Sequence, residues 1–279
     1  MWNLKPLEGF DARGHLDIAF ANDEVTSTEK DFLIDLYKEY EECSGRPSDA
    51  MEGKGQRPAL YELVHDAYGL VQDNNRLKDL RADLKLLADY CPYCGFGEIS
   101  DLDHLLQRGR FKLLSIFALN LVPCCGVCNR GKRKKPSIEC SKHQLHTYLE
   151  SVSAFDFLRA DARINPKSGA LEVTYSVEQC PGMSAELHAR LKLHLIEFKL
   201  QKKYVKQVNI HLNEQVTALK MAYRMGATVL KDFLLETAEA HKDNFGINDW
   251  RTALFRALAE CEAFWSGGFE RALGMRTKV

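Results

Sequence analysis

The sequence lacks any run of about eighteen consecutive apolar residues, the length that a membrane-spanning helix requires. Its opening residues, Met1-Trp-Asn-Leu-Lys-Pro-Leu-Glu, do not follow the basic-then-apolar order of a secretory signal peptide. An excess of one charge is also missing, because 38 basic side chains oppose 39 acidic ones and leave a net charge of −1. We therefore expect a cytoplasmic protein without membrane association, whose attraction to nucleic acid would come from a local patch.

Internal repeats and low-complexity tracts are absent as well. The 279 residues, 45% of them hydrophobic and 28% charged, can bury a core and have room for one large domain or two to three small ones. The nine cysteines are odd in number, and four of them form two Cys-x-x-Cys pairs. This pattern disfavours a secreted disulfide framework and favours metal binding in a reducing compartment.

Apolar spacing predicts helices over most of the chain. Thr26 and Glu29 form a capping-box pattern at the start of a helix that ends near Cys43. Apolar residues recur every three or four positions from Leu60 to Leu87, which predicts one long amphipathic helix. The turn sequence 166–169, Pro-Lys-Ser-Gly, predicts a short hairpin.

The C-terminal part is expected to be mainly helical. The predicted helices cover Ala185 to beyond Tyr204, 216–241 and 250–265. Ser184 is the expected N-cap of the first of these, and Asn248 of the last.

The two cysteine pairs predict a structural zinc site. Cys91-Pro-Tyr-Cys94 and Cys125-Gly-Val-Cys128 each offer two thiolates in a tight turn, and four thiolates suit a tetrahedral Zn²⁺ ion. Coincident buried thiols, or an iron site with the same ligands, are the alternatives. Cys124 could compete as a ligand, but only Cys125 keeps the two-residue spacing to Cys128.

Thirty residues separate Cys94 from Cys125, more than the roughly fifteen to twenty of a plain zinc ribbon. This insertion holds Asp103-His104 and Asn120-Leu-Val-Pro, and the second pair is followed by Asn129-Arg-Gly-Lys132. The order Cys-x-x-Cys, Asp-His, Asn-Leu-Val-Pro, Cys-x-x-Cys-Asn-x-x-Lys closely resembles the HNH nuclease family over about forty residues.

The resemblance implies a small ββα-metal module with a four-cysteine zinc site, embedded between mainly α-helical N- and C-terminal regions, and hence an α+β fold class. The expected divisions are a helical region at 1–88, the nuclease module at 89–150 and a mainly helical domain at 151–279. The implied activity is metal-dependent hydrolysis of phosphodiester bonds, with DNA expected ahead of RNA.

Phosphodiester hydrolysis needs a base for water and a cation for the developing charge. His104 suits the first task, because a histidine of ordinary pKa can be a neutral base at physiological pH. Asp103 and Asn129 offer the hard oxygens that Mg²⁺ or Mn²⁺ prefers, and by similarity to the family they bind the catalytic ion. Asn120 corresponds to the family's middle Asn, which would hydrogen-bond the loop backbone and hold His104 in place.

Basic residues crowd around the module and predict contacts with phosphates that carry no sequence readout. The predicted patch comprises Arg108, Arg110, Lys112, Arg130, Lys132, Arg133, Lys134 and Lys135. A solvated charge run is the plainer alternative.

The segment after His104 also resembles a subgroup found in bacterial phage defence, such as the nuclease subunit of Septu-like systems, which works with an ATPase partner. Gln107 and Arg108 replace that subgroup's Pro-Lys pair. A defence effector with a partner such as an ATPase is therefore one expectation. A zinc-dependent nucleic-acid-binding or adaptor protein without turnover is the alternative.

The remaining candidate ligands give weaker signals. Cys140, His143 and His146 recur every three residues and could form a second metal site, but they lack a fourth partner. Six further histidines occur singly and are expected to be structural: His15, His65, His188, His194, His211 and His241.

Overall fold

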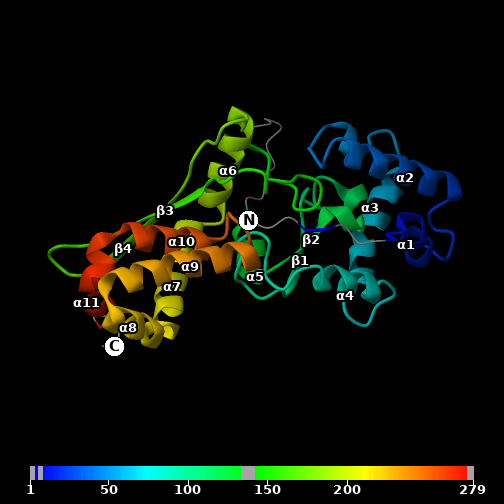
Figure 1. Cartoon of the computed structure of the whole chain (residues 1–279). Helices are drawn as coiled ribbons and strands as arrows, with labels where there is room; N and C mark the ends of the chain where they lie inside the picture. The colour runs from blue at the N-terminus through cyan, green and yellow to red at the C-terminus, as the bar shows by residue number, and fades with distance from the viewer. Residues whose placement is uncertain (1–3, 6–8, 133–141, 275–279) are drawn as a thin grey trace. The chain divides into compact units, whose positions relative to one another are not determined.

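The computed structural model describes residues 4–5, 9–132 and 142–274 (Figure 1). The chain divides into two compact units, Met1–Val152 and Ser153–Val279. Both are mainly helical and each contains one two-stranded antiparallel sheet, which makes the protein α+β in the broad sense. The predicted helical region 1–88 and the module 89–150 lie in the same unit. In the described ranges, none of the helices combines the length and apolar character that crossing a bilayer requires.

The N-terminal unit begins with helices whose starts follow from their sequence. α1 spans Ala12–Ala19, and α2 spans Ser27–Glu42. At the start of α2 the Thr26 hydroxyl accepts from the Glu29 amide at 3.2 Å, and the Glu29 carboxylate accepts from the Thr26 amide at 2.8 Å. The predicted capping box is confirmed. The short 3-10 helix η1, Ala50–Glu52, follows.

The single long helix predicted between Leu60 and Leu87 is wrong. Three elements occupy this stretch: α3 (Pro58–Asp66), the 3-10 helix η2 (Ala67–Val71) and α4 (Lys78–Leu86). Asn74, with φ of 67°, lies in the turn between η2 and α4, and the turn closes where the Leu77 amide donates to the Leu70 carbonyl at 2.9 Å. The periodicity survives the break because the apolar residues on both sides face one core.

A β–β–α unit follows. Strand β1, Asp101–His104, pairs antiparallel with β2, Leu121–Cys124, and α5, Gly126–Gly131, comes directly after β2 (Figure 1). The connection between the strands contains two single-turn 3-10 helices, η3 (Lys112–Leu114) and η4 (Ala118–Asn120). It is anchored by side chains that are almost fully buried: Phe111, Leu113, Leu114, Ile116, Phe117 and Ala118.

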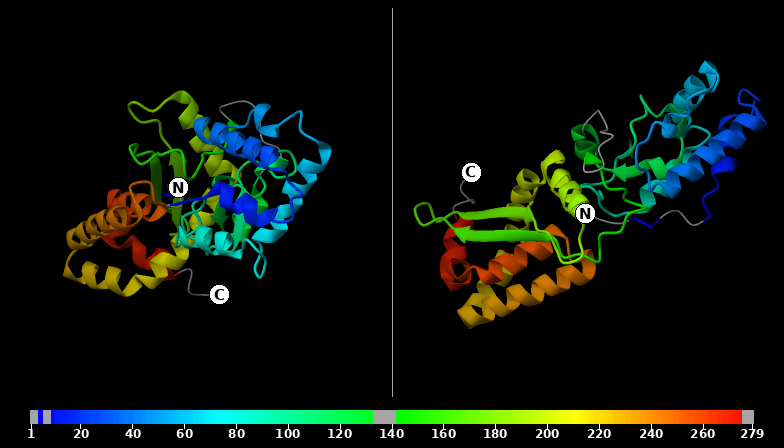
Figure 2. Two further views of the ribbon diagram at one scale, coloured as in Figure 1. Left: turned by 90° about the vertical axis from the view of Figure 1, so that its right-hand side faces the viewer. Right: turned by 90° about the horizontal axis from the view of Figure 1, so that it is seen from above.

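The C-terminal unit pairs a hairpin with a helical layer. Strands β3, Leu158–Ile164, and β4, Leu171–Val177, form the predicted hairpin, and alternate residues of β4 are buried. β3 packs on α10, which also packs on α9 (Figure 2). The helices are α6 (Ala185–Glu197), α7 (Leu200–Glu214), α8 (Val216–Met225), α9 (Ala227–Phe245), α10 (Trp250–Glu260) and α11 (Phe269–Gly274), with the π-helical turn η6 (Phe264–Gly268) before the last.

Two predicted C-terminal helices are divided. Ser184 caps α6 as expected, but Lys199, with φ of 52°, separates α6 from α7. Gly226, with φ of 139°, separates α8 from α9, a backbone conformation that favours glycine. The predicted N-cap Asn248 is wrong by one position, because Asp249 caps α10.

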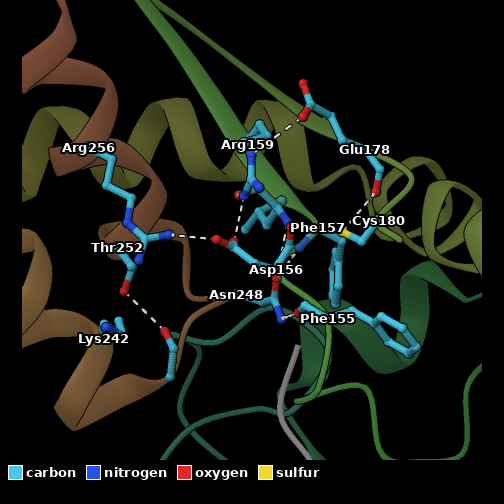
Figure 3. A network of polar contacts seen from close by, with 12 residues as sticks. Phe155, Asp156, Phe157, Arg159, Glu178, Cys180, Lys242, Asn248, Thr252 and Arg256 are labelled. Atoms are coloured by element: carbon cyan, nitrogen blue, oxygen red, sulfur yellow. Dashed lines mark hydrogen bonds and ion pairs between the residues drawn. The ribbon is translucent and has the colours of Figure 1, made fainter. Parts of the chain in front are cut away.

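Asn248 braces the chain that leads into β3. Its side-chain oxygen accepts from the amides of Phe157 and Leu158 at 2.8 and 3.1 Å, and its side-chain nitrogen donates to the Phe155 carbonyl at 2.6 Å. In Figure 3 the carboxylate of Asp156 lies beside this brace, between two guanidinium groups. The buried Asn therefore fixes an irregular segment that no regular ladder holds.

Candidate active site and cysteine cluster

The four predicted zinc ligands come together. The sulfur atoms of Cys91, Cys94, Cys125 and Cys128 all lie within 4.8 Å of one another, and all four residues are buried. The Cys94 and Cys125 sulfurs are 4.0 Å apart. Zn–S bonds of about 2.3 Å in a tetrahedron give sulfur separations of about 3.8 Å. The donor set and its size therefore fit a structural zinc ion.

Local backbone geometry creates the two cysteine turns. The Cys91 carbonyl accepts from the amides of Cys94 and Gly95 at 3.2 and 2.8 Å, and Gly95 has φ of 76°. The Cys125 carbonyl accepts from the amides of Cys128 and Asn129 at 3.0 Å each, so the second pair is the first turn of α5. A Cβ atom on Gly97 would lie 2.8 Å from the Cys125 sulfur. Only glycine fits at that position.

Hydrogen bonds within the cluster shift the pKa values of its thiols in opposite directions. Bonds with the thiols of Cys128, Cys91 and Cys94 lower the pKa of Cys125 far below its usual range, while bonds with Cys125 raise the pKa of Cys91 and Cys128. Cys124, the neighbour that could have competed, lies outside the cluster, and burial raises the pKa of its thiol. The fit to zinc therefore rests on the positions of the four sulfur atoms.

His104, the last residue of β1, is held by one ring nitrogen. Its Nε2 donates to the Ser115 carbonyl at 2.9 Å, and the Tyr68 ring meets the imidazole edge to face at 4.4 Å. Burial lowers the pKa of His104 to about 3, so the ring is neutral at pH 7. With the proton on Nε2, the lone pair is on Nδ1, which makes the ring a potential base.

Asp103 is buried and receives two donors on one oxygen. Its Oδ2 accepts from the Tyr93 hydroxyl at 2.8 Å and from the Lys132 ammonium at 2.7 Å. Tyr93 stands between the two cysteines of the first pair, and burial raises the pKa of its hydroxyl, which keeps it a donor. The cysteine turn thus positions the carboxylate directly.

The Lys132 ammonium lies among three oxygen atoms next to His104. Besides the Asp103 carboxylate, its ammonium contacts the carbonyl oxygens of His104 and Leu105 at 2.6 and 2.9 Å. Three hard oxygens therefore surround a cation beside His104. The same kind of oxygen donor suits Mg²⁺ or Mn²⁺, so the donor chemistry fits a divalent ion at this end of β1.

Asn129 contacts a residue that the sequence prediction missed. Its side-chain amide donates to the Asp101 carboxylate at 3.0 Å. Asp101 precedes Asp103 by two positions on β1, so both carboxylates project from the same face of the strand. The alternation Asp-Leu-Asp in a predicted strand is the signal that could have identified Asp101.

Asn120 is buried at the end of η4, directly before β2, and its side chain makes three hydrogen bonds to backbone. Its Oδ1 accepts from the Leu106 amide at 2.7 Å, and its Nδ2 donates to the carbonyls of Leu106 and Leu114 at 3.1 and 3.2 Å. These bonds fix both ends of the segment that begins after His104 and leads to Ser115. The contacts are of the type that the predicted bracing role requires.

A second layer supports Asn120. The Tyr40 hydroxyl lies 3.3 Å from Asn120 Oδ1 and 3.1 Å from His146 Nε2. His146 Nδ1 accepts from the amides of Tyr148 and Leu149 at 3.2 Å each, so its proton is on Nε2 and points to Tyr40. Both ring nitrogens of His146 are engaged, which removes it from the predicted second metal site with His143. Cys140 lies outside the described residues.

Most of the predicted phosphate contacts that the structure describes have side-chain partners. Arg110 pairs with Glu52 at 2.7 Å, and Lys112 pairs with Glu62 at 2.5 Å. Arg108 lies over the Tyr68 ring at 5.1 Å. With Lys132 bound to Asp103, three of the predicted phosphate contacts are thus neutralised by carboxylates. Arg130 lies at the end of α5, and the predicted contacts Arg133, Lys134 and Lys135 fall outside the described residues.

Comparison with known proteins identifies one similar sequence. The chain is 28% identical to Protein ea31 of Escherichia phage lambda over 193 residues, which cover 63% of this chain and 64% of that protein. No family model and no solved structure matches the chain.

Proposed function

We propose that the protein is a metal-dependent HNH endonuclease that hydrolyses phosphodiester bonds in nucleic acid. The observation that carries the proposal is His104, held through Nε2 at the end of β1 and adjacent to the buried Asp103. It lies in a β–β–α unit whose helix carries Asn129. The residues at these positions match the HNH motif in order and type.

His104 would act as the general base. Its Nδ1 would take a proton from the attacking water while Nε2 keeps its bond to the Ser115 carbonyl, so the ring need not reorient. Water would attack phosphorus as the bond to the 3′ oxygen breaks, and that oxygen would take a proton from solvent, so that the products carry 5′-phosphate and 3′-hydroxyl ends. Asn120 would keep the ring in place through the backbone.

Asp103 and Asn129 would hold a Mg²⁺ or Mn²⁺ ion, with Asp101 as an additional carboxylate. The ion would supply positive charge to the phosphate as negative charge develops on it. Lys132 already places an ammonium group against Asp103 and contributes charge of the same sign. Zinc in the cysteine cluster would be structural and would hold Tyr93 against Asp103.

DNA is the proposed substrate ahead of RNA, although attack by water needs no 2′-hydroxyl and the same chemistry is open to RNA. The biological role that we propose is a bacterial antiviral defence effector acting with a protein partner such as an ATPase. The resemblance of the segment after His104 to the defence subgroup supports this role.

A second candidate is a zinc-dependent nucleic-acid-binding or adaptor protein without turnover. The ion pair between Lys132 and Asp103 favours it, because an ammonium group occupies a carboxylate oxygen that a catalytic ion would use. Turnover would require the ion to bind another oxygen or to displace Lys132.

Cleavage of plasmid DNA, single-stranded DNA and RNA with Mg²⁺ or Mn²⁺ tests the proposal. We expect His104→Ala to lower the cleavage rate by about 10²- to 10⁴-fold at unchanged zinc content, since a general base contributes about that much. The matched control is His188→Ala, a partly buried histidine of α6 that bonds the Val177 carbonyl. Equal cleavage by His104→Ala and the natural chain would refute the proposal. Nucleic-acid binding without cleavage by either would favour the adaptor.

A further inference from the structure

Two histidines of the C-terminal unit meet ring to ring. His211 of α7 and His241 of α9 have their Nε2 atoms 3.3 Å apart. The side-chain amide of Gln215, at the end of α7, lies 3.1 Å from the same nitrogen of His211. Both histidines are only partly buried, so the pair can be reached from solvent. The two histidines are thirty residues apart in sequence, and no motif links them.

Hydrogen bonding alone does not satisfy this arrangement. A neutral imidazole nitrogen offers either one proton or one lone pair. If His211 Nε2 accepts from His241, it has no second lone pair for the Gln215 amide. Turning the Gln215 amide by 180° would place its oxygen next to His211 Nε2 instead. If His211 Nε2 then donates its proton to His241, it has no second proton to donate to that oxygen. Three polar groups thus converge on a point where one hydrogen bond can form.

We propose that His211, His241 and Gln215 form a second metal site, for a borderline divalent cation of the Zn²⁺ class. Zn–N bonds of about 2.0–2.1 Å in a tetrahedron place the nitrogens about 3.3–3.4 Å apart, which is the separation between the two histidines. The Gln215 oxygen would be the third ligand after its amide turns. Water would complete the coordination.

The surroundings suit metal-binding imidazoles. The His241 ring packs against the rings of Phe245 and Phe255, with centroids 5.7 and 5.2 Å away, which restricts its orientation beside His211. The carboxylate of Glu214 lies 3.8 Å from His211 Nδ1, on the side of the ring away from His241. This distance is too long for a hydrogen bond, so the carboxylate contributes negative charge near the site and does not orient the ring.

The positive charge of Arg251, which lies near the proposed site, is balanced by a carboxylate. Arg251 would repel a cation, but its guanidinium pairs with the Asp249 carboxylate at 3.0 Å and lies over the Phe245 ring at 4.1 Å. Trp250 and Phe255 meet the His211 ring edge to face at 5.7 Å each. The site therefore has an aromatic wall on one side and a carboxylate on the other.

Equilibrium dialysis of the full chain against buffered micromolar Zn²⁺ tests the proposal. We expect His211→Gln and His241→Gln each to bind one equivalent less than the natural chain, while the control His188→Gln binds the same amount. The cysteine cluster and any ion at Asp103 contribute equally to all four proteins and cancel in the difference. Equal zinc content in the natural chain and the His241→Gln variant would overturn the proposal.

A measurement on the natural chain covers the case in which the variants do not fold. With ¹⁵N-labelled histidine, titration of the zinc-loaded protein with further Zn²⁺ should shift the Nε2 signals of two of the nine histidines together. Lowering the pH should reverse the shift as protons displace the metal. If no pair of Nε2 signals moves, the two histidines share a proton and do not bind metal.

Discussion

The two units differ in what holds their irregular segments in place. In the N-terminal unit β1 and β2 have four residues each and α5 has six, and the cysteine cluster ties them together. In the C-terminal unit β3 and β4 have seven residues each and α9 has nineteen, so extended packing supplies the rigidity. Helices as short as α5 are not stable alone. The candidate active-site segment therefore depends on the cysteine cluster, whereas the long strands and helices of the other unit support one another.

Both units also use a buried asparagine as a brace. Asn120 holds the loop after His104 with three bonds to backbone, and Asn248 holds the chain before β3 with three bonds to backbone. The difference lies in what is braced: a candidate active-site loop in one unit and a strand entry in the other. The two asparagines are thus a matched pair for separating activity from stability.

The largest expected effect comes from removing a zinc ligand. Cys128→Ser should unfold the N-terminal unit and leave the C-terminal unit folded, because a structural zinc site contributes about 10–16 kcal/mol, comparable to the whole stability of a domain. Hydrogen exchange resolved by peptide should show lost protection at 101–128 and retained protection at 158–258. The control Cys43→Ser removes an exposed thiol and should change nothing. Loss of protection in both units would mean that they fold as one.

Replacing each bracing asparagine by alanine sharpens the comparison between the two units. Asn120→Ala and Asn248→Ala should each cost about 2–4 kcal/mol in the free energy of unfolding of their own unit, because each leaves buried backbone groups without partners. Only Asn120→Ala should also abolish nucleic-acid cleavage. Urea unfolding and the plasmid assay measure the two effects. A loss of cleavage in Asn248→Ala at full folding would tie the second brace to the active site.

A smaller effect is expected from removing one buried tyrosine hydroxyl in each unit. Tyr40→Phe removes the contacts to Asn120 and His146 and should cost about 1–2 kcal/mol, with a reduced cleavage rate. Tyr175→Phe removes a buried hydroxyl that donates to the Trp250 carbonyl at 3.2 Å and should cost a similar amount with unchanged cleavage. Equal cleavage rates for the two variants would show that the Tyr40 layer does not position His104.

The smallest expected effect concerns two carboxylates at helix starts, Glu29 and Asp249, whose contributions to stability change with pH in opposite directions. Hydrogen bonds from Arg57 lower the pKa of Glu29 to about 2, so its contribution is present above pH 4.5 and is lost as pH falls towards 2. Burial raises the pKa of Asp249, so the natural chain loses stability there as pH rises through that raised pKa. We expect Glu29→Gln to cost about 1 kcal/mol at pH 7 and Asp249→Asn to cost less.

Urea midpoints for each unit at several pH values between 3 and 7 check this contrast. The deficit of Glu29→Gln relative to the natural chain should shrink as the pH falls, while that of Asp249→Asn should grow. Parallel curves for the two variants would contradict the opposite assignments.

Sequence patterns correctly predicted the elements that depend on contacts between residues close in sequence. The capping box at Thr26, the hairpin around Asn165 and the cysteine turns depend on neighbours in sequence, and each forms as expected. The breaks at Asn74 and Lys199 could not be predicted, because the apolar periodicity continues across them wherever both sides face one core. A non-glycine residue with positive φ leaves little signal in sequence.

For the candidate site, the sequence identified the residues but not their partners. The four cysteines form the cluster that their spacing predicts, and Asp103 and Asn120 are both buried. The Tyr93 and Lys132 contacts to Asp103, and the acidic partners of Arg110 and Lys112, arise from tertiary packing that a linear pattern does not encode. The charges in the sequence do not indicate which of the predicted phosphate contacts lie beside a carboxylate.

The hydrogen bond from Tyr93 to Asp103 has a consequence for the newly made protein. Because Tyr93 lies between Cys91 and Cys94, a metal ion bound by the cysteine cluster would hold its hydroxyl against Asp103. If the chain is the nuclease proposed above, zinc uptake would be the step that completes the candidate site, and a newly made chain would be inactive until it takes up the metal.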